Sequence, residues 1–208
     1  MIAVVDYGMG NVTSVRNGFE LLGIETVLTH DTLVMDRCKG IVVPGVGAFG
    51  CAADDLEQKG LMEYLQHRER QGTFILGICL GLQLFFDESE EDPGFEGMHL
   101  LPGRVIRFPH GVKVPHMGWN RVYFTREDPL FNQVPGESHF YFAHSFFASP
   151  ENKEHALAHC NYGASFAAAV KKNSVYGLQF HPEKSGRLGL TILKNFERMV
   201  ADADHSSS

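Results

Sequence analysis

Short apolar runs alternate with segments of helical periodicity over the first 86 residues of the chain. The runs occupy residues 2–5, 25–28, 40–43 and 73–78. After the first run, a suitable N-cap precedes apolar residues at helical spacing, namely Asn11 and then Val12, Val15, Phe19 and Leu22. Further helices are predicted over residues 61–70 and directly after residue 79. Strands that are apolar throughout and alternate with helices predict a mostly parallel sheet covered on both faces, which is a three-layer αβα sandwich.

The second half of the chain has a different pattern. Residues 87–97 are acidic and contain proline and glycine, which is typical of a loop. The segments that follow alternate like antiparallel strands, at residues 104–108, 120–124, 139–147, 165–171 and 175–180. An amphipathic helix over residues 188–200 closes the domain. We therefore expect one α/β domain over residues 1–200 with a strand-rich antiparallel extension, followed by a disordered polar tail at residues 201–208.

Composition narrows the class of protein. With 208 residues, of which 44% are hydrophobic, the chain has enough apolar surface for one sizeable core. A formal net charge of -7 without clustered lysine and arginine argues against a nucleic-acid-binding surface, so we expect small molecules or proteins as partners. No apolar run approaches the roughly 20 residues that cross a bilayer. Scattered cysteines without a C-x-x-C pair, and no leader signal at the N-terminus, predict a cytoplasmic location.

Cys79 is the first candidate for chemistry. It follows the apolar run at residues 73–78, precedes a predicted helix, and has Gly77 and Gly81 two positions away on either side. Glycines relieve crowding at a sharp turn between strand and helix, so this spacing predicts a nucleophile elbow that presents the thiol. The unpaired N–H groups at the start of the helix favour the thiolate. The alternative is an inert thiol buried in the core, which is common for cysteine.

His181 and Glu183 supply what such a thiol needs, a base and a carboxylate that orients the base. Pro182 lies between them and favours extended backbone before it, where residues two apart face the same side. Glu183 would accept a hydrogen bond from one ring nitrogen and leave the other free to take the Cys79 proton. The alternatives are a metal-binding pair and a surface histidine. Because the motif offers only two ligands, we expect no metal, and no cofactor is predicted.

Attack on a carbonyl also needs donors for the oxyanion that forms. The backbone N–H of Leu80 is one donor. The turn at residues 44–47 follows the third apolar strand and can direct further amides to the same place if that strand neighbours the one before Cys79. Ligands gather at such carboxyl ends of strands in open α/β sheets, although an ordinary loop is the alternative. From these residues, we interpret the chain as a cysteine-dependent amide hydrolase.

Three stretches together resemble the class I glutamine amidotransferase family, the triad glutaminases: residues 44–47, 77–83 and 177–185. Within the family, further stretches are similar to the glutaminase subunits of imidazole glycerol phosphate synthases: residues 6–11, 115–120 and 141–147. The resemblance spans residues 1–200 and implies a flavodoxin-like fold. The combination of motifs is specific, although each short motif alone is not.

The resemblance implies hydrolysis of L-glutamine to glutamate and ammonia through a γ-glutamyl thioester on Cys79. His181 would act first as base and then as acid, with Glu183 holding it. The mobile oxyanion strand would consist of Gly45, Val46 and Gly47. The glutamine would be held by Gln83 and by the backbone near Ser145 and Phe146. Many family members carry tyrosine at the position of Phe146, so this chain has no hydroxyl to offer there.

By the same resemblance, the ammonia passes to a (β/α)8-barrel cyclase subunit in a heterodimer of histidine biosynthesis, because ammonia released into water would be protonated. Residues 115–120, Lys184 and the aromatic residues around Tyr141 are candidates for the rim that faces this partner. Trp119 fits this rim or the core equally well. Since a Gly-Val-Gly turn can flip a peptide at low cost, we expect its oxyanion donor to be misdirected until the partner binds.

Other interpretations stay open. Similar glutaminases supply ammonia for amidation of a nucleotide-linked sugar in surface polysaccharide synthesis, and the triad does not distinguish the two acceptors. A third kind feeds pyridoxal phosphate synthase, but residues 115–120 argue against it. From other classes, a cysteine protease and a non-catalytic binding module with Cys79 as a redox sensor are conceivable. A sensor has no need of His181 and Glu183.

Overall fold

The computed structural model describes residues 1–8 and 11–205. Strands and helices alternate in its first part: β1 (Ile2–Val5), α1 (Val12–Glu20), β2 (Thr26–Thr29), α2 (Thr32–Met35), β3 (Gly40–Gly45), α3 (Phe49–Gln58), α4 (Leu61–Arg70), β4 (Phe74–Cys79) and α5 (Leu80–Gln83). The second part is rich in strands and 3-10 helices (η): β5 (Glu88–Ser89), β6 (Gly103–Arg107), β7 (His116–Phe124), η1 (Pro129–Phe131), β8 (Glu137–His144), β9 (Phe146–Pro150), η2 (Lys153–His155), β10 (Ala156–Asn161), β11 (Ser165–Lys172), β12 (Val175–Leu178), η3 (Pro182–Lys184) and α6 (Gly186–His205). None of the described helices combines the length and apolar character that a membrane span requires.

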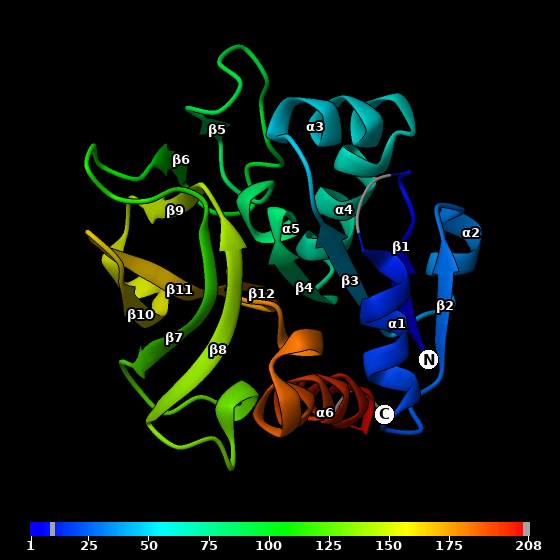
Figure 1. Ribbon diagram of the computed structural model, residues 1–208. Coiled ribbons are helices and arrows are strands. Elements are labelled where there is room, and N and C mark those ends of the chain that lie inside the picture. The colour runs from blue at the N-terminus through cyan, green and yellow to red at the C-terminus, as the bar shows by residue number, and fades with distance from the viewer. Residues whose placement is uncertain (9–10, 206–208) are drawn as a thin grey trace.

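A nine-stranded sheet runs through the molecule in the order β2-β1-β3-β4-β12-β11-β10-β7-β8 (Figure 1). From β2 to β12 in this order, neighbouring strands are parallel. From β12 to β8 they are antiparallel. A second sheet has the order β5-β6-β9. The predicted parallel core and antiparallel extension are confirmed, and they meet in one continuous sheet. Two of the strands predicted for the extension lie elsewhere: β12 is antiparallel only to β11 and pairs parallel with β4, and β6 belongs to the second sheet.

The parallel strands are apolar throughout because both of their faces are covered. In β1, Ile2 and Val4 pack in the same core as α1 and α6, whereas Ala3 and Val5 pack in the core that contains α3 and α4. Figure 1 shows the same grouping, with α3 and α4 on one side of the sheet and α1 and α6 on the other. Burial of each large aliphatic side chain contributes about 2 kcal/mol. The predicted three-layer αβα sandwich is therefore confirmed.

Strand β12 joins the two halves of the sheet and brings distant parts of the sequence together. It pairs parallel with β4, with Leu178 opposite Ile78. On its other side, β4 pairs parallel with β3, and Gly45 lies opposite Cys79. Parallel neighbours end at the same edge of a sheet, which is where open α/β sheets bind their ligands. The residues after β3, β4 and β12 therefore converge at the carboxyl edge.

The predicted single strand over residues 139–147 is wrong. The chain breaks at Ser145, so that β8 ends at His144 in the large sheet and β9 begins at Phe146 in the small one. The alternation of polar and apolar residues continues across the break. A change of sheet depends on packing between distant segments, so the local pattern has no signal for it.

The C-terminal helix is also longer than predicted. Because α6 extends from Gly186 to His205, the prediction of a disordered tail is wrong for residues 201–205, and residues 206–208 lie outside the described part. Ala201 and Ala203 have high helix propensity, and lengthening an existing helix needs no new nucleus. The sequence pattern does not predict α2, α3, β5 or β10, nor the three short 3-10 helices η1, η2 and η3. Residues 9–10 of the predicted first turn are not among the described residues.

Candidate active site

The sharp turn between strand and helix predicted at Cys79 is present. Strand β4 ends at Cys79, and α5 begins at the next residue, Leu80. Cys79 has φ 56° and ψ -109°, a left-handed backbone conformation that is rare outside glycine. Such strain costs about 1–3 kcal/mol and persists where the surrounding structure imposes it, most often at functional sites. The side chain is 5% exposed, so the thiol is largely shielded from bulk water.

Gly77 and Gly81 are required by the close packing around this turn. A Cβ on Gly77 would lie 2.7 Å from the carbonyl oxygen of Gly81, and a Cβ on Gly81 would overlap the carbonyl oxygen of Val43. Neither glycine has a positive φ. The pair of glycines therefore serves the close approach of α5 to β4 and β3 rather than an unusual backbone conformation.

Helix α5 is a single turn, from Leu80 to Gln83, and is much shorter than a helix with a strong dipole. The expectation that helix N–H groups stabilise the thiolate is therefore weakened. Two other groups contact the sulfur of Cys79. The thiol donates to the carbonyl oxygen of Ala143 at 3.7 Å, and Nε2 of Gln179 donates to the sulfur at 3.8 Å.

His181 reaches the same edge from the neighbouring strand β12. Its Nδ1 bonds with Oε1 of Glu183 at 2.8 Å, and the Glu183 side chain is fully buried. The backbone N–H of His181 donates to the carbonyl of Tyr141 at 2.9 Å, and the hydroxyl of Ser185 donates to the carbonyl of His181 at 2.6 Å. The imidazole and the carboxylate meet as predicted, although Glu183 lies in η3, which begins at Pro182, and not in extended chain.

The electrostatics of His181 link it to the sulfur. Burial alone lowers its pKa, but interactions with Cys79 and Glu183 outweigh burial and raise the pKa to about 9. The raised pKa favours the protonated ring. An imidazolium beside a thiol favours the thiolate, as in other cysteine–histidine pairs. The thiol of Cys79 and the imidazole of His181 can therefore exchange one proton.

The turn at residues 44–47 lies beside Cys79, as the oxyanion prediction requires, because β3 and β4 are neighbours. A Cβ on Gly45 would lie 2.8 Å from the Cβ of Leu80, so a side chain there would push the two strand ends apart. Gly47 has φ 109°, in the region that favours glycine. Both glycines therefore allow the turn to approach the thiol closely.

A cavity of about 250 Å³ lies at this edge of the sheet. Most of the residues predicted from the sequence line it: Val46, Gly47, Cys79, Leu80, Gln83, Ser145 and Phe146. Ser145 enters the lining because the chain changes sheet there. The remaining three, Gly45, His181 and Glu183, are outside the lining.

Gln83 has a different set of contacts from the one expected. Its Nε2 donates to the carbonyl of Phe146 at 2.8 Å and to Oε1 of Gln179 at 3.1 Å. Both N–H groups of its amide are therefore used inside the protein. What Gln83 can offer a ligand is its carbonyl oxygen, an acceptor.

Further residues at the site were not among the candidates from the sequence. Glu91 lines the cavity, its Oε2 accepts from the backbone N–H of Phe49 at 3.0 Å, and burial raises its pKa. Tyr7 is buried and donates to the carbonyl of Pro44 at 2.8 Å, which holds the start of the oxyanion turn. Gln179 lies within a recognised motif, but its contact with the sulfur depends on tertiary structure. Glu91 belongs to the acidic segment at residues 87–97, whose composition predicts only a loop.

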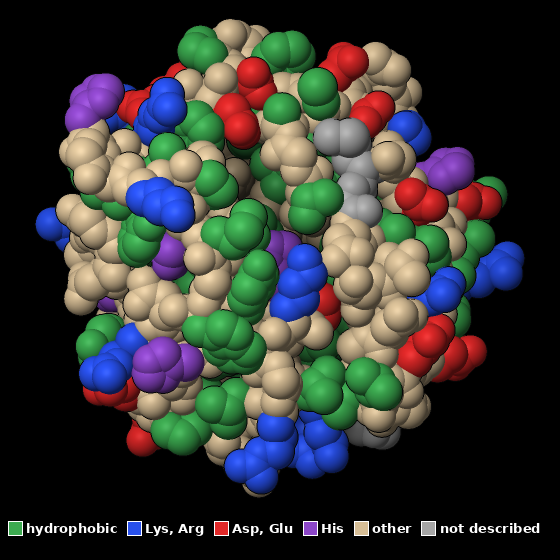
Figure 2. Space-filling view, viewed as in Figure 1, with side chains coloured by type: hydrophobic (Ala, Val, Ile, Leu, Met, Phe, Trp, Pro, Cys, Tyr) green, Lys and Arg blue, Asp and Glu red, His purple; other side chains and the backbone are tan. Residues whose placement is uncertain are grey.

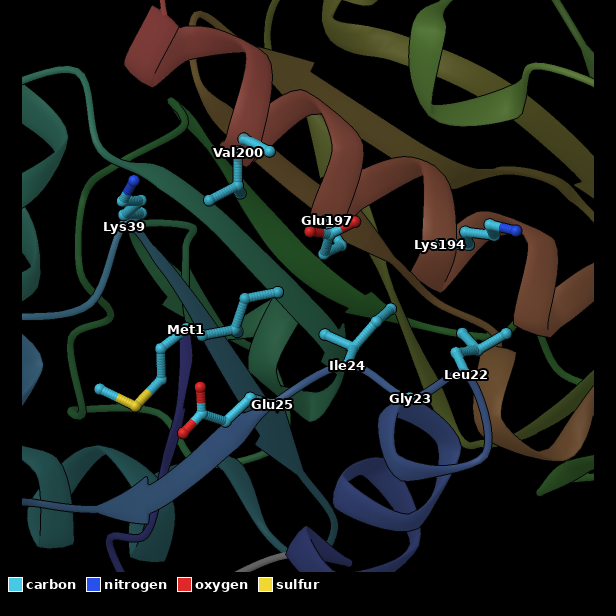
Figure 3. A pocket seen from close by; sticks show the side chains of 11 residues that line it. Met1, Leu22, Gly23, Ile24, Glu25, Lys39, Lys194, Glu197 and Val200 are labelled. Atoms are coloured by element: carbon cyan, nitrogen blue, oxygen red, sulfur yellow. The ribbon is translucent and has the colours of Figure 1, made fainter.

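A larger cavity of about 480 Å³ lies at the opposite edge of the parallel strands, between α6, the end of α1 and the beginnings of the strands (Figure 3). Its charged lining residues include Glu25, Lys39 and Glu197, but the lining contains no cysteine, serine or histidine. Size therefore does not identify the reactive site. Among the described residues, no group of three or more histidine, cysteine, aspartate or glutamate side chains is placed to hold a metal ion.

Comparisons with known proteins agree with the geometry. The family model described as "Glutamine amidotransferase class-I" matches residues 3–199. "Imidazole glycerol phosphate synthase subunit HisH" of Moorella thermoacetica is 45% identical over 205 residues, which are 99% of this chain and 98% of that protein. The subunit of the same name from Methanothermobacter thermautotrophicus is 44% identical, over 96% of this chain and 99% of that protein. A crystal structure of a glutamine amidotransferase has the same fold, with a TM-score of 0.77, 18% identity and coverage of 97% of this chain and 100% of that one. The chain belongs to the class I glutamine amidotransferase family.

Proposed function

We propose that the protein is the glutaminase subunit of an imidazole glycerol phosphate synthase and hydrolyses L-glutamine to glutamate and ammonia. One observation carries this proposal. The thiol of Cys79 and the His181–Glu183 pair come from neighbouring parallel strands and interact beside a cavity that the turn at residues 44–47 also lines. Relatives that cover nearly the whole chain are named as subunits of this synthase, which supports the assignment.

In the first half of the reaction, the Cys79 thiolate attacks the side-chain amide carbon of glutamine. A carbon–sulfur bond forms, and the carbonyl oxygen becomes an oxyanion. The oxyanion then collapses, the carbon–nitrogen bond breaks, and ammonia leaves with a proton from His181. A γ-glutamyl thioester remains on Cys79.

In the second half, water attacks the thioester carbon while the neutral His181 takes a proton from the water. The carbon–sulfur bond breaks, glutamate leaves, and the thiolate and imidazolium are restored. Glu183 holds the ring in place and stabilises its charged form in both halves.

The cavity has groups that suit both ends of glutamine. The developing oxyanion would be met by the backbone N–H of Leu80 and by the turn containing Val46 and Gly47. The α-ammonium group needs acceptors, and the carboxylate of Glu91 and the amide oxygen of Gln83 provide them. The α-carboxylate would be bound by the backbone of Ser145 and Phe146, where β8 and β9 separate.

The mouth of the cavity has an exposed apolar rim. Val46 is 38% exposed and Met117 64%, and both line the cavity; Trp119, on the same strand as Met117, is 57% exposed. Packing in the core is therefore not the role of Trp119. Figure 2 shows hydrophobic side chains gathered across the middle of the face that carries β8. Large exposed apolar residues around a cavity are typical of a protein-binding site.

This rim supports docking of the ammonia acceptor over the cavity. The partner would be a (β/α)8-barrel cyclase subunit in a cytoplasmic heterodimer, and the ammonia would pass between the two without entering bulk water. Lys184, whose Nζ lies 5.9 Å from the centre of the Tyr141 ring, belongs to the same rim. The oxyanion turn would reach its active conformation when the partner binds, since Gly47 can reorient at low cost.

The test is glutamine turnover by the complete chain, alone and with a purified cyclase subunit and its ribonucleotide ligand. We expect low turnover alone, strong stimulation by the cyclase, and incorporation of the amide nitrogen into imidazole glycerol phosphate. If an enzyme that amidates a nucleotide-linked sugar stimulates turnover and the cyclase does not, the ammonia acceptor is the sugar and our assignment of the cyclase is wrong. Peptide cleavage without glutamine hydrolysis would indicate a protease, and no turnover with any acceptor would favour a sensor. Equal turnover with and without the cyclase would contradict activation of the oxyanion turn.

A further inference from the structure

A continuous chain of buried and partly buried hydrogen bonds crosses the site and ends at the nucleophile. Its members, in order, are Asn120, His116, His144, the carbonyl of Phe146, Gln83, Gln179 and the sulfur of Cys79. Gln179 is fully buried, and Gln83, His116 and His144 are each at most 6% exposed. The reaction proposed above uses the two ends of the glutamine pocket but assigns nothing to Gln179.

The direction of each hydrogen bond near Cys79 follows from one backbone group. The carbonyl of Phe146 can only accept, so Gln83 must direct its NH2 group to it, at 2.8 Å. The second hydrogen of that NH2 group is directed at Gln179, at 3.1 Å, so Gln179 must present its carbonyl oxygen there. The amide of Gln179 therefore has its NH2 group on the other side, facing the sulfur of Cys79 at 3.8 Å.

The hydrogen bonds at the histidine end of the chain also point towards the carbonyl of Phe146. The amide of Asn120 is oriented by two backbone groups, since its oxygen accepts from the N–H of Arg121 at 2.7 Å and its NH2 group donates to the carbonyl of Asn161 at 3.1 Å. Asn120 therefore donates to Nε2 of His116, at 3.1 Å. His116 must then donate from Nδ1 to Nε2 of His144, at 3.0 Å. This leaves Nδ1 of His144 as the donor to the Phe146 carbonyl, at 2.8 Å, which is what that carbonyl requires.

We propose that Gln179 is a catalytic residue: its side-chain amide donates a hydrogen bond to the Cys79 sulfur and stabilises the thiolate, and Gln83 holds it in the donating orientation. The inference rests on the proposed function, because it takes Cys79 as the nucleophile. Besides His181, the sulfur also contacts the carbonyl of Ala143, which accepts and so favours the protonated thiol. Gln179 offsets that effect at the moment when the proton moves to His181.

Other titratable groups surround the sulfur and contribute to its behaviour. These are His181 and Glu183 after β12, Tyr7 after β1, His144 at the end of β8, and Glu91 in the lining of the cavity. The test must therefore change Gln179 without changing any of them. Gln179→Met removes the donor with little change in volume, and Gln179→Glu directs an acceptor at the sulfur in place of a donor.

The experiment measures alkylation of Cys79 by iodoacetamide against pH in the complete chain, with each cysteine followed by peptide mass spectrometry. Cys51 is exposed and serves as the reference thiol in the same sample. We expect Gln179→Met to move the pH midpoint of Cys79 alkylation upward by about one unit, which is tenfold in thiolate population, and Gln179→Glu to move it further. The profile of Cys51 should stay where it is. If the role of Gln179 were purely structural, the pH midpoint of Cys79 alkylation would not be higher in Gln179→Glu than in Gln179→Met.

The matched control is Asn195→Leu, which removes another buried amide. Asn195 lies on α6 and donates to the carbonyls of Leu130 and Asn132, at 3.0 and 2.7 Å. This variant should leave the Cys79 midpoint unchanged. If Gln179→Met does not fold, Gln83→Met provides the second arm, because it frees the Gln179 amide to rotate and should move the midpoint in the same direction by less. An unchanged Cys79 midpoint in a folded Gln179 or Gln83 variant would overturn the proposal.

The outcome is separable from that of the proposed function. Alkylation is measured without glutamine and without a partner protein. A wild-type chain that hydrolyses no glutamine but shows the Gln179-dependent midpoint would refute the glutaminase assignment alone. A chain that hydrolyses glutamine while its midpoint is independent of Gln179 would refute this inference alone.

Discussion

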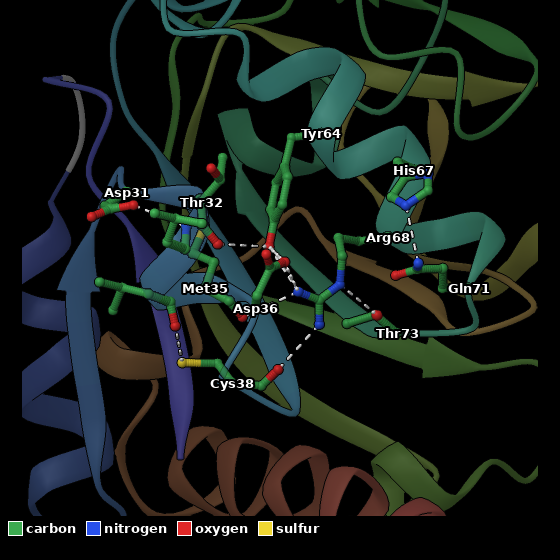
Figure 4. A network of polar contacts seen from close by, with 12 residues as sticks. Asp31, Thr32, Met35, Asp36, Cys38, Tyr64, His67, Arg68, Gln71 and Thr73 are labelled. Carbon is green, nitrogen blue, oxygen red and sulfur yellow. Dashed lines mark hydrogen bonds and ion pairs between the residues drawn. The ribbon is translucent and has the colours of Figure 1, made fainter.

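Two polar networks with buried members differ in the groups at which their hydrogen bonds end. One is the chain from Asn120 to Cys79. The other surrounds Arg68 on α4, which is 8% exposed (Figure 4). The partners of Arg68 are the carbonyls of Met35 and Cys38 and the side chains of Asp36, Tyr64 and Thr73, at 2.7 to 3.2 Å. Each of the three guanidinium nitrogens donates, and most of the acceptors are groups that never change their protonation.

The difference shows how a stabilising network can be told from a reactive one. The Arg68 network joins α2, α4 and the start of β4, and every hydrogen bond in it ends at an oxygen. The site network ends at a sulfur on a strained residue, Cys79, next to a histidine, His181, whose pKa is raised to about 9. A polar network that ends on a strained residue next to a base is suited to chemistry, whereas one that saturates the donors of a buried guanidinium is suited to holding elements together. Mutations should therefore separate the two, with activity affected at one and stability at the other.

The largest effect is expected from Cys79→Ala. It removes the nucleophile, so kcat/KM for glutamine hydrolysis should fall by about 10⁴-fold or more, as for other catalytic nucleophiles. The free energy of unfolding should change by less than about 1 kcal/mol, because the substitution removes only one sulfur atom. Steady-state kinetics and urea unfolding measure the two quantities. Cys51→Ala, at an exposed thiol, is the matched control and should leave both unchanged. A Cys79→Ala variant with substantial turnover would contradict the account.

The next effect is expected from Glu183→Gln, which keeps the shape of the side chain but removes its charge. We expect a loss of roughly 10³-fold in kcat/KM, because His181 loses the partner that orients it and stabilises its charged form. Wild-type activity should decline as the pH rises through about 9, where His181 loses the proton that the leaving ammonia needs. In the variant this alkaline limb should lie at lower pH, since Glu183 contributes to the raised pKa. Glu151→Gln, at an exposed position, should leave the pH profile in place.

Arg68→Met tests the other network. It leaves the carbonyls of Met35 and Cys38 without their donor, and the free energy of unfolding should fall by about 3 kcal/mol, or roughly 10 °C in Tm. The ion pair with Asp36 contributes little to this loss, because that side chain is 55% exposed. Activity per folded molecule should stay within about twofold. Arg70→Met, on the exposed face of the same helix, should leave the stability unchanged. A large loss of activity in folded Arg68→Met would remove the distinction between the networks.

The smallest effect concerns the stability of the site network in acid. Burial lowers the pKa of His116 to about 4 and that of His144 to about 3. Both values lie below those of an unfolded chain, so the unfolded state binds more protons between about pH 6.5 and pH 4, and stability falls as the pH is lowered through this window. The slope should be at most about 1.4 kcal/mol per pH unit for each histidine.

Urea unfolding between pH 7 and pH 4 measures this slope. His116→Gln should make it shallower, because one buried titrating group is lost. His110→Gln, at an exposed histidine, should retain the wild-type slope. An unchanged slope in His116→Gln would show that the ring is not held neutral in the folded state.

The sequence contains enough local information for the triad but not for the network behind it. Cys79 and His181 each follow a predicted strand, and their motifs identify the two residues. The pattern indicates an antiparallel strand at residues 175–180, so the shared carboxyl edge comes from the parallel pairing of β12 with β4, which only the structure shows. The helix α3 also had a usable signal, since Phe49, Ala52 and Leu56 recur at helical spacing and are all buried. That signal begins shortly after the turn at residues 44–47, for which the sequence predicts an oxyanion role.

Other features depend on packing between distant segments. The break at Ser145 separates two sheets without interrupting the alternation of residues. The single turn of α5 could not be read from an apolar stretch that continues to Phe86. The contact between Gln179 and Cys79 joins residues 100 positions apart, and its direction follows from the carbonyl of a third segment. The periodicity of apolar residues along the sequence cannot predict the direction of such a hydrogen bond.

The most direct test of the central claim is labelling of the complete chain with 6-diazo-5-oxo-L-norleucine, a glutamine analogue that alkylates the nucleophile of a glutaminase. Intact-mass and peptide mass spectrometry would locate the adduct. We expect one adduct per chain, on Cys79, and none in Cys79→Ala. Labelling of Cys38, Cys51 or Cys160 instead, or no labelling of the folded wild-type chain, would contradict it.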